Sequence, residues 1–160
     1  MNKYLSRNKE GFTLIEILVV IAILAVIAVA VFVALNPAQR LADARNSRRV
    51  NDVNNLLTAI HECIVDNDGV VSNCGLSSPL TPANEIGGCL AGAAACTGTT
   101  DCVNLEASNL VTQGYLRTMP LDPLGGSATT TGYSVEVDAN GIVIVSSCNA
   151  ELGEVIEVAR

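Results

Sequence analysis

The sequence of 160 residues predicts an α+β fold, in which a long N-terminal helical spine packs on a small C-terminal antiparallel β-sheet. Three patterns carry this prediction. Residues 12–35 form an apolar run, residues 50–64 repeat apolar side chains at spacings of three and four, and the chain after residue 132 alternates with period two. We expect four segments: a short N-terminal segment (1–11), a hydrophobic transmembrane helix (12–36), an amphipathic stem helix (37–66) and a globular head (67–160).

The transmembrane helix is predicted from the run Ile17–Leu35, which contains only Ala, Val, Ile, Leu and Phe. As an α-helix this run would be ~28 Å long, enough to cross the hydrocarbon core of a bilayer. Lys3, Arg7 and Lys9 precede it. By the positive-inside rule they keep the N-terminus in the cytoplasm, so the rest of the chain is expected on the far side of the membrane.

One carboxylate, that of Glu16, lies at the start of this apolar segment. A charge at hydrocarbon depth costs about 2.5–3.5 kcal/mol on insertion scales, which makes Glu16 a candidate functional residue with a partner to be found. An ordinary secretory signal peptide is an alternative, because Ala28-Val29-Ala30 offers a small-x-small cleavage site. The length of the apolar run disfavours a signal peptide, and Glu16 disfavours both a signal peptide and a plain anchor.

The motif KEGFTLIE at residues 9–16, followed by an uninterrupted apolar helix, resembles the class III signal of type IV pilins and pseudopilins. The resemblance implies that residues 1–11 are a leader, that a prepilin peptidase cuts between Gly11 and Phe12, and that Phe12 is then N-methylated. It also implies that Glu16 pairs with the Phe12 amine of a neighbouring subunit. Because an unpaired charge in an apolar helical bundle is penalised, this pair would fix the axial register of the subunits.

The resemblance implies a location and a set of partners. The subunit would be held in the cytoplasmic membrane by one span and then displayed in an extracellular filament at the cell surface. Its implied partners are copies of itself in a helical filament, the prepilin peptidase, an inner-membrane assembly platform, and the lipid bilayer before assembly. Adhesion, motility or DNA uptake would be properties of the filament.

Two alternative functions stay open beside the filament subunit. One is a pseudopilin of a type II secretion or competence system, which would form only a short filament. The other is a membrane-anchored exported binding module, which would use the apolar helix only as an anchor and would keep an uncut N-terminus.

The stem helix is expected to pack against the head through an apolar stripe and to end in the turn Asp66–Gly69. The stripe comprises Val50, Val53, Leu57, Ile60 and Ile64. Pro37 opens the stem, where it should kink or loosen the long helix.

Four arginines lie near the start of the stem: Arg40, Arg45, Arg48 and Arg49. We weigh a solvated face beside lipid headgroups against contact with the acidic head or stem of an adjacent subunit. Direct binding of nucleic acid is disfavoured, because the acidic side chains gather after Val50 and make the head anionic.

All six cysteines lie beyond the apolar segment: Cys63, Cys74, Cys89, Cys96, Cys102 and Cys148. An even number in a short exported domain predicts disulfides formed in an oxidising compartment. Six cysteines allow 15 connectivities, which the sequence does not resolve. Zinc is disfavoured, because there is no C-x-x-C pair and His61 is the single histidine.

The sheet is predicted from Tyr133–Asp138, Ile142–Val145 and Glu154–Val158, with a turn at Asp138–Gly141, whereas Val70–Thr112 is expected to be rich in loops. No catalytic constellation, phosphate-binding glycine motif or nucleophile elbow is found. We therefore expect a structural protein that is not an enzyme and needs no cofactor.

The stretch from Leu116 to Gly126, followed by Tyr133, resembles the P-x-D-P-x-G…Y element of secretion pseudopilins. In that family the element precedes the sheet and lies near a calcium-binding loop, which implies Asp122, Asp138 or Asn140 as candidate ligands. The alternative is that Asp122 and Asn140 are turn residues. No other metal site is expected.

Overall fold

The structure of the protein, a computed structural model, describes the chain in three stretches: residues 11–88, 101–105 and 110–160. Two compact units, Met1–Arg40 and Leu41–Arg160, are treated separately below. Gly11 is the one residue of the predicted leader that is described. The remaining leader residues lie outside the described stretches, as do two of the cysteines, Cys89 and Cys96.

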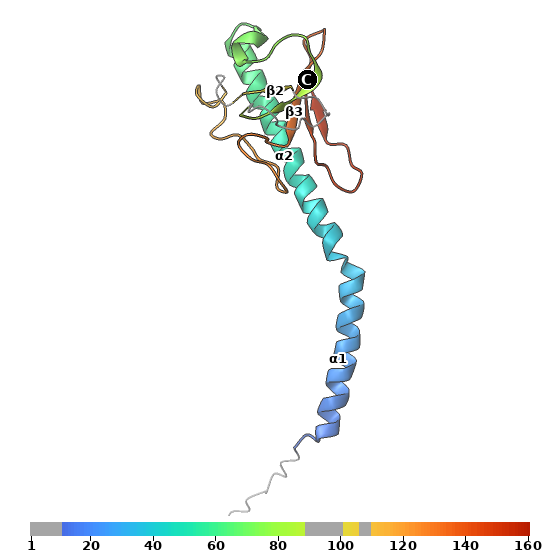
Figure 1. The fold of residues 1–160 in the computed structure, drawn as a ribbon. Helices are drawn as coiled ribbons and strands as arrows, with labels where there is room; N and C mark the ends of the chain where they lie inside the picture. The colour runs from blue at the N-terminus through green and yellow to red at the C-terminus, as the bar shows by residue number, and fades with distance from the viewer. Residues whose placement is uncertain (1–10, 89–100, 106–109) are drawn as a thin grey trace, which may run out of the picture. The chain divides into compact units, whose positions relative to one another are not determined.

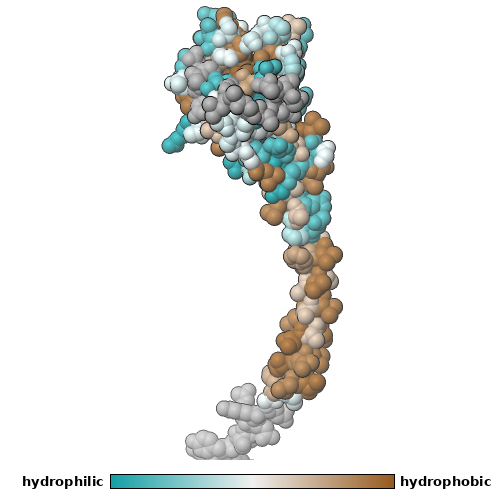
Figure 2. Space-filling view, in the orientation of Figure 1, coloured by the Kyte–Doolittle hydropathy of each residue, from teal (hydrophilic) through white to brown (hydrophobic). Residues whose placement is uncertain are grey.

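The first unit is dominated by α1, the helix Leu14–Leu35 (Figure 1). Its 22 residues would span ~33 Å at 1.5 Å per residue. No residue of α1 is buried, and its surface is apolar along its length (Figure 2). By length and composition the helical stretch that begins at Leu14 could cross a membrane.

The break after α1 has a local cause in Asn36 and Pro37. Asn36 adopts the left-handed conformation, with φ +40°, and caps the C-terminal end of α1. Asparagine enters this region more readily than most residues. Pro37 then begins the next helix, where its missing N–H removes no intrahelical hydrogen bond.

The helix α2 (Pro37–Asp66) belongs to the second unit from Leu41 onward, and there it turns one face toward the interior. Its bounds coincide with those expected for the stem, although Val50, assigned to the apolar stripe, is exposed. The helix ends in a Schellman-type cap, in which the Gly69 N–H donates to the Ile64 carbonyl at 2.8 Å and Asp68 takes a positive φ. The buried residues of α2 are Ala42, Asn46, Arg49, Val53, Leu56, Leu57, Ala59, Ile60 and Cys63.

The sheet has five strands in the order β2-β1-β3-β4-β5. The strands are β1 (Leu80–Ile86), β2 (Cys102–Val103), β3 (Tyr133–Val137), β4 (Val143–Ser147) and β5 (Glu157–Ala159). The prediction of a purely antiparallel sheet is wrong, because β1 and β2 pair in parallel while the other neighbours are antiparallel. The connection of 15 residues between β1 and β2 is long enough to return the chain in the same direction, which a tight turn cannot do.

β1 lies within the segment that we expected to be loop, an expectation to which Pro82 contributed. A proline cannot donate to a ladder and normally argues against a strand. Here Pro82 falls where the register with β3 shifts, between Leu80 and Asn84, and β2 pairs only with Glu85 and Ile86. The missing N–H therefore falls outside the regular ladder on both sides.

The β3–β4 hairpin was predicted from Asn140-Gly141 and is present, with Val137 opposite Val143. The turn is longer than a two-residue hairpin. Its backbone is held by Asp138, whose Oδ1 accepts the N–H groups of Asn140 and Ile142, both at 2.8 Å. Gly141 takes φ +85°, which a residue with a side chain would adopt only with strain.

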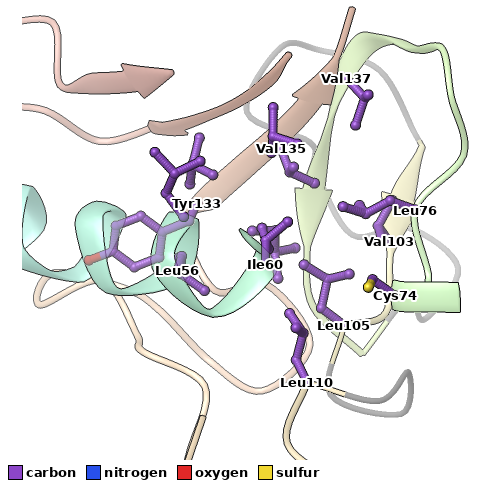
Figure 3. Packing of buried hydrophobic residues seen from close by; sticks show 14 of the residues in the cluster. Leu56, Ile60, Cys74, Leu76, Val103, Leu105, Leu110, Tyr133, Val135 and Val137 are labelled. Atoms are coloured by element: carbon purple, nitrogen blue, oxygen red, sulfur yellow. The ribbon is translucent and has the colours of Figure 1, made fainter. Parts of the chain in front are cut away.

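The core lies between α2 and one face of the sheet (Figure 3). Leu56 and Ile60 from α2 lie toward Tyr133 and Val135 of β3, with Leu105 packing from the segment that follows β2. All five are fully buried. The interior is aliphatic apart from the ring of Tyr133, as expected for a chain with so few aromatic residues.

Candidate functional site

The N-terminus of α1 is closed by a capping box made by Thr13 and Glu16. The Thr13 Oγ1 accepts the Glu16 backbone N–H at 3.3 Å and donates to Glu16 Oε2 at 2.8 Å. The same Oε2 accepts the Thr13 N–H at 2.9 Å. This box is the threonine-x-x-glutamate pattern, a sequence signal for the start of a helix that Thr13 and Glu16 carry. The hydrogen bonds leave Oε1 of Glu16 without a partner among the described residues.

The predicted cleavage junction lies immediately before this box. Gly11 and Phe12 are both exposed, and 85% of the Phe12 surface is accessible. A cut between them would create an amine four residues before Glu16, at the edge of the apolar helix. Gly11 and Phe12 thus lie just before the capping box, on an accessible end of the unit.

α1 also carries a continuous apolar surface that nothing in its own unit covers. Even the least exposed of its large apolar side chains, Val19, is 47% accessible. A helix that is apolar all round is stable only when lipid or other helices surround it. This surface defines where the unit must meet a hydrophobic environment.

A second polar cluster, centred on Arg49, lies in the head. The Arg49 side chain is fully buried, and its guanidinium forms a bidentate pair with Asp122, with Nε at 2.6 Å from Oδ2 and Nη2 at 3.2 Å from Oδ1. Its Nη1 also donates to Asn46 Oδ1 at 2.9 Å and to Glu151 Oε2 at 2.8 Å. The bond to Asp122 raises the pKa of Arg49, so the guanidinium stays charged in the interior.

Arg45 completes this cluster on its solvent side. It donates to both carboxylate oxygens of Glu151, with Nε at 2.6 Å from Oε2. The bonds from Arg45 and Arg49 hold the pKa of Glu151 down at about 2. Asn46 Nδ2 donates to the Glu151 carbonyl and, at 2.8 Å, to Glu154. The cluster therefore ties the C-terminal segment after β4 to α2.

These contacts decide between the two alternatives weighed for the arginines of the stem. For Arg49 both alternatives are wrong, because its side chain is fully buried and its carboxylate partners belong to the same chain. Arg45 also has its carboxylate partner, Glu151, within the same chain. Arg48 differs, since its side chain is 60% exposed and its nearest carboxylate, Asp52, is 3.6 Å away on the next turn. An exposed pair at this spacing contributes little to stability.

The candidate calcium ligands do not come together. Asp122 accepts the buried guanidinium and the Leu124 N–H, so a cation there would be repelled by Arg49. Asp138 and Asn140 instead build the β3–β4 turn. Within residues 11–88, 101–105 and 110–160, no three His, Cys, Asp or Glu side chains are grouped to hold a metal ion.

The described cysteines are all oxidised. Cys63 near the end of α2 is bonded to Cys74 at the end of the 3₁₀ helix η1, Val71–Cys74. Cys102 and Cys148 are also disulfide-bonded, and none of the four described cysteines is free. The Cys63–Cys74 disulfide thus links the 3₁₀ helix η1 to α2.

Comparison with known protein families gives a match at the N-terminal end of the chain. Residues 6–32 match the prokaryotic N-terminal methylation motif, the class III prepilin signal of type IV pilins and pseudopilins. The match spans the Gly11–Phe12 junction, the capping box and most of α1, and it confirms the resemblance inferred from KEGFTLIE. Neither the curated proteins nor the solved structures gave a significant match.

The motif and the fold agree on a class of protein. A long N-terminal helix joined to a small mixed sheet is a pilin-like α+β architecture. Together with the methylation motif it supports a type IV pilin-like or pseudopilin protein, a structural class that is typically non-enzymatic. The same signal supports anchoring in a membrane followed by display in a surface filament.

Proposed function

We propose that this chain is a structural subunit of a type IV pilus-like filament. It is cut after Gly11, N-methylated at Phe12 and polymerised through α1. Before assembly α1 spans the cytoplasmic membrane with the leader in the cytoplasm. Copies of the chain then replace the lipid around α1, and the head faces outward.

The observation that carries this proposal is the combination of Glu16 with a helix that has no other charge and no buried face. A passive anchor gains only the capping of α1 from this carboxylate, and a glutamine would supply the same cap without the penalty of a charge at the membrane edge. In a filament, the carboxylate meets the new Phe12 amine of a neighbouring copy. The Oε1 atom is available for that contact while Oε2 remains in the capping box.

The test separates pairing from helix capping by comparing Glu16→Ala with Glu16→Gln. A glutamine can still cap α1 through Thr13, because the capping box accepts glutamate or glutamine. It cannot neutralise an amine, and leaving one member of a buried pair alone costs about 3–5 kcal/mol. We expect both variants to be exported and held in the membrane but to yield no sheared fibres. Normal fibre abundance with Glu16→Gln would overturn the assembly role of the charge.

A pseudopilin of a secretion or competence system is the second candidate. It is favoured by the turn around Asp122, whose sequence resembles the secretion pseudopilin element. Electron microscopy of the organism's surface distinguishes the two. Abundant long fibres built mainly of this chain support a pilin, whereas fibres that stay short or need co-expressed secretion components support a pseudopilin.

A further inference from the structure

The solvent-facing side of α2 is divided by charge along its length. Arg40 and Arg48 lie in its first half, and Glu62 and Asp66 lie in its last two turns; all four are exposed. At about 100° per residue, these positions fall within an arc of roughly 80° on an ideal helix. They therefore form one stripe, which we call the α2 stripe, with a basic end and an acidic end.

This charge order opposes the helix macrodipole. Cations are favoured near the C-terminal end of a helix and anions near the N-terminal end. α2 has no acidic residue in its first turn and no basic residue in its last. Arg40 and Asp66, which lie in the end turns of α2, are therefore unfavourably placed in an isolated chain, and this favours a contact outside the chain for them.

The charges of the stripe are poorly satisfied within the chain, in contrast to those of the buried cluster. Arg48 has only the 3.6 Å approach to Asp52. Asp66 accepts a hydrogen bond from the Tyr115 hydroxyl at 2.9 Å and forms no ion pair with a described residue. Arg40 and Glu62 likewise have no described ionic partner.

Between its two ends the stripe is uncharged and lies close to the helix. Asn51 and Thr58 within the stripe, and Asn54 beside it, each hydrogen-bond a backbone carbonyl four residues earlier, at 2.7–3.0 Å. Ser47 does the same with Asp43. These residues are weaker helix formers than Ala, Glu or Lys, which would be favoured on a merely solvated face. Short side chains folded onto their own helix allow a second helix to approach.

We propose that the α2 stripe docks a second copy of this chain, with the two α2 helices parallel and displaced along their axes. The basic end of one copy then faces the acidic end of the next. The inference rests on the proposed function, since a shared direction of all copies is what a filament built through α1 imposes. Such a contact is heterologous and does not close on itself, so it can repeat along a filament.

The spacing of the charges sets the displacement. If Arg48 of one copy meets Glu62 of the next, the two helices are displaced by 14 residues; if Arg40 meets Asp66, they are displaced by 26 residues. The displacement therefore lies between these limits, or about 21–39 Å along the helix. Charge complementarity favours this occupant over others. Lipid headgroups would attract the arginines but repel the acidic end, and nucleic acid would be repelled in the same way.

The test is a charge reversal with rescue in the full-length chain. Arg40→Glu combined with Arg48→Glu reverses the basic end, and Glu62→Lys combined with Asp66→Asn changes the acidic end while keeping an acceptor for Tyr115. Each pair creates like-charge contacts, and we expect it to lower sheared fibre by at least about tenfold with membrane-held protein unchanged. Combining all four changes should restore fibre to near the wild-type amount.

Two controls keep the outcomes distinct. Arg117→Glu reverses an exposed charge elsewhere on the head and should leave fibre abundance unchanged. Each detergent-solubilised variant should melt at the wild-type temperature. If the variant with both Glu62→Lys and Asp66→Asn melts lower, the single change Glu62→Lys is used in its place. Absence of fibres from the wild-type chain overturns the proposed function together with this inference. Wild-type fibres that tolerate either reversal, or that the combined variant fails to restore, overturn the α2 stripe contact alone.

Discussion

Replacing Arg49 by methionine should destabilise the head severely. The substitution keeps an unbranched side chain in the buried site but removes the guanidinium that pairs with Asp122 at 2.6 Å. Both side chains are fully buried, so Asp122 would be left as an uncompensated charge, at a typical cost of about 3–5 kcal/mol. For a head of this size that corresponds to a fall in Tm of roughly 10–20 °C.

The assay is thermal unfolding of the full chain in detergent, followed by near-ultraviolet circular dichroism. Arg48→Met is the matched control, since it removes an exposed arginine one position away and should change the free energy of unfolding by no more than about 1 kcal/mol. Adding Asp122→Asn to Arg49→Met should recover part of the loss, because the buried charge is then removed as well. If Arg49→Met melts within a few degrees of the wild type, or Arg48→Met is equally damaging, the assigned role of the cluster is wrong.

Three further predictions concern the head. Glu85 is buried with its Oε2 unpartnered among the described residues, and burial raises its pKa. Its contribution to stability is therefore present at low pH and is lost as pH rises through the folded-state pKa. Glu85→Gln should reduce the loss of unfolding free energy between pH 4 and pH 8 that denaturant titrations measure for the wild type. The pKa of Glu151 is lowered to about 2, so its contribution to stability is present above the unfolded-state value near 4.5 and is lost as pH falls toward 2. The difference in unfolding free energy between wild type and Glu151→Gln should therefore shrink over that interval in acid titrations. Replacing Cys63 and Cys74 together by serine should cost about 2–4 kcal/mol in denaturant unfolding, and an unchanged midpoint would show that the disulfide is dispensable.

The elements with strong local signals could be predicted from the sequence. The apolar run, Pro37 and the period of the stem fix α1 and α2, and Asn140-Gly141 fixes the hairpin. β1 and its parallel partner β2 could not be predicted. Pro82 within β1 is typical of a loop, so the sequence pattern does not indicate a strand there. The pairing of β2 depends on a long connection whose path the sequence does not reveal.

The capping box of α1 and the Arg49 cluster also differ in how far they could be predicted from the sequence. Thr13 and Glu16 are three residues apart, so their contact follows from one helical turn, and Phe12 directly precedes them in the sequence. The carboxylate partners of Arg49 are 73 and 102 residues away, and no short motif joins them. One signal was available: position 49 falls on the same helical face as Val53 and Leu56, and an arginine in the phase of a buried stripe requires a buried carboxylate.

The central claim, that the chain is processed as a prepilin and assembles through its new N-terminus, is tested most directly by mass spectrometry of the native N-terminal peptide from sheared fibres. We predict a chain that begins at Phe12 and carries one methyl group on its α-amine, and a Gly11→Val variant that keeps its leader and yields no fibres. A native chain that still begins at Met1, or one that begins after Ala30, would contradict the account.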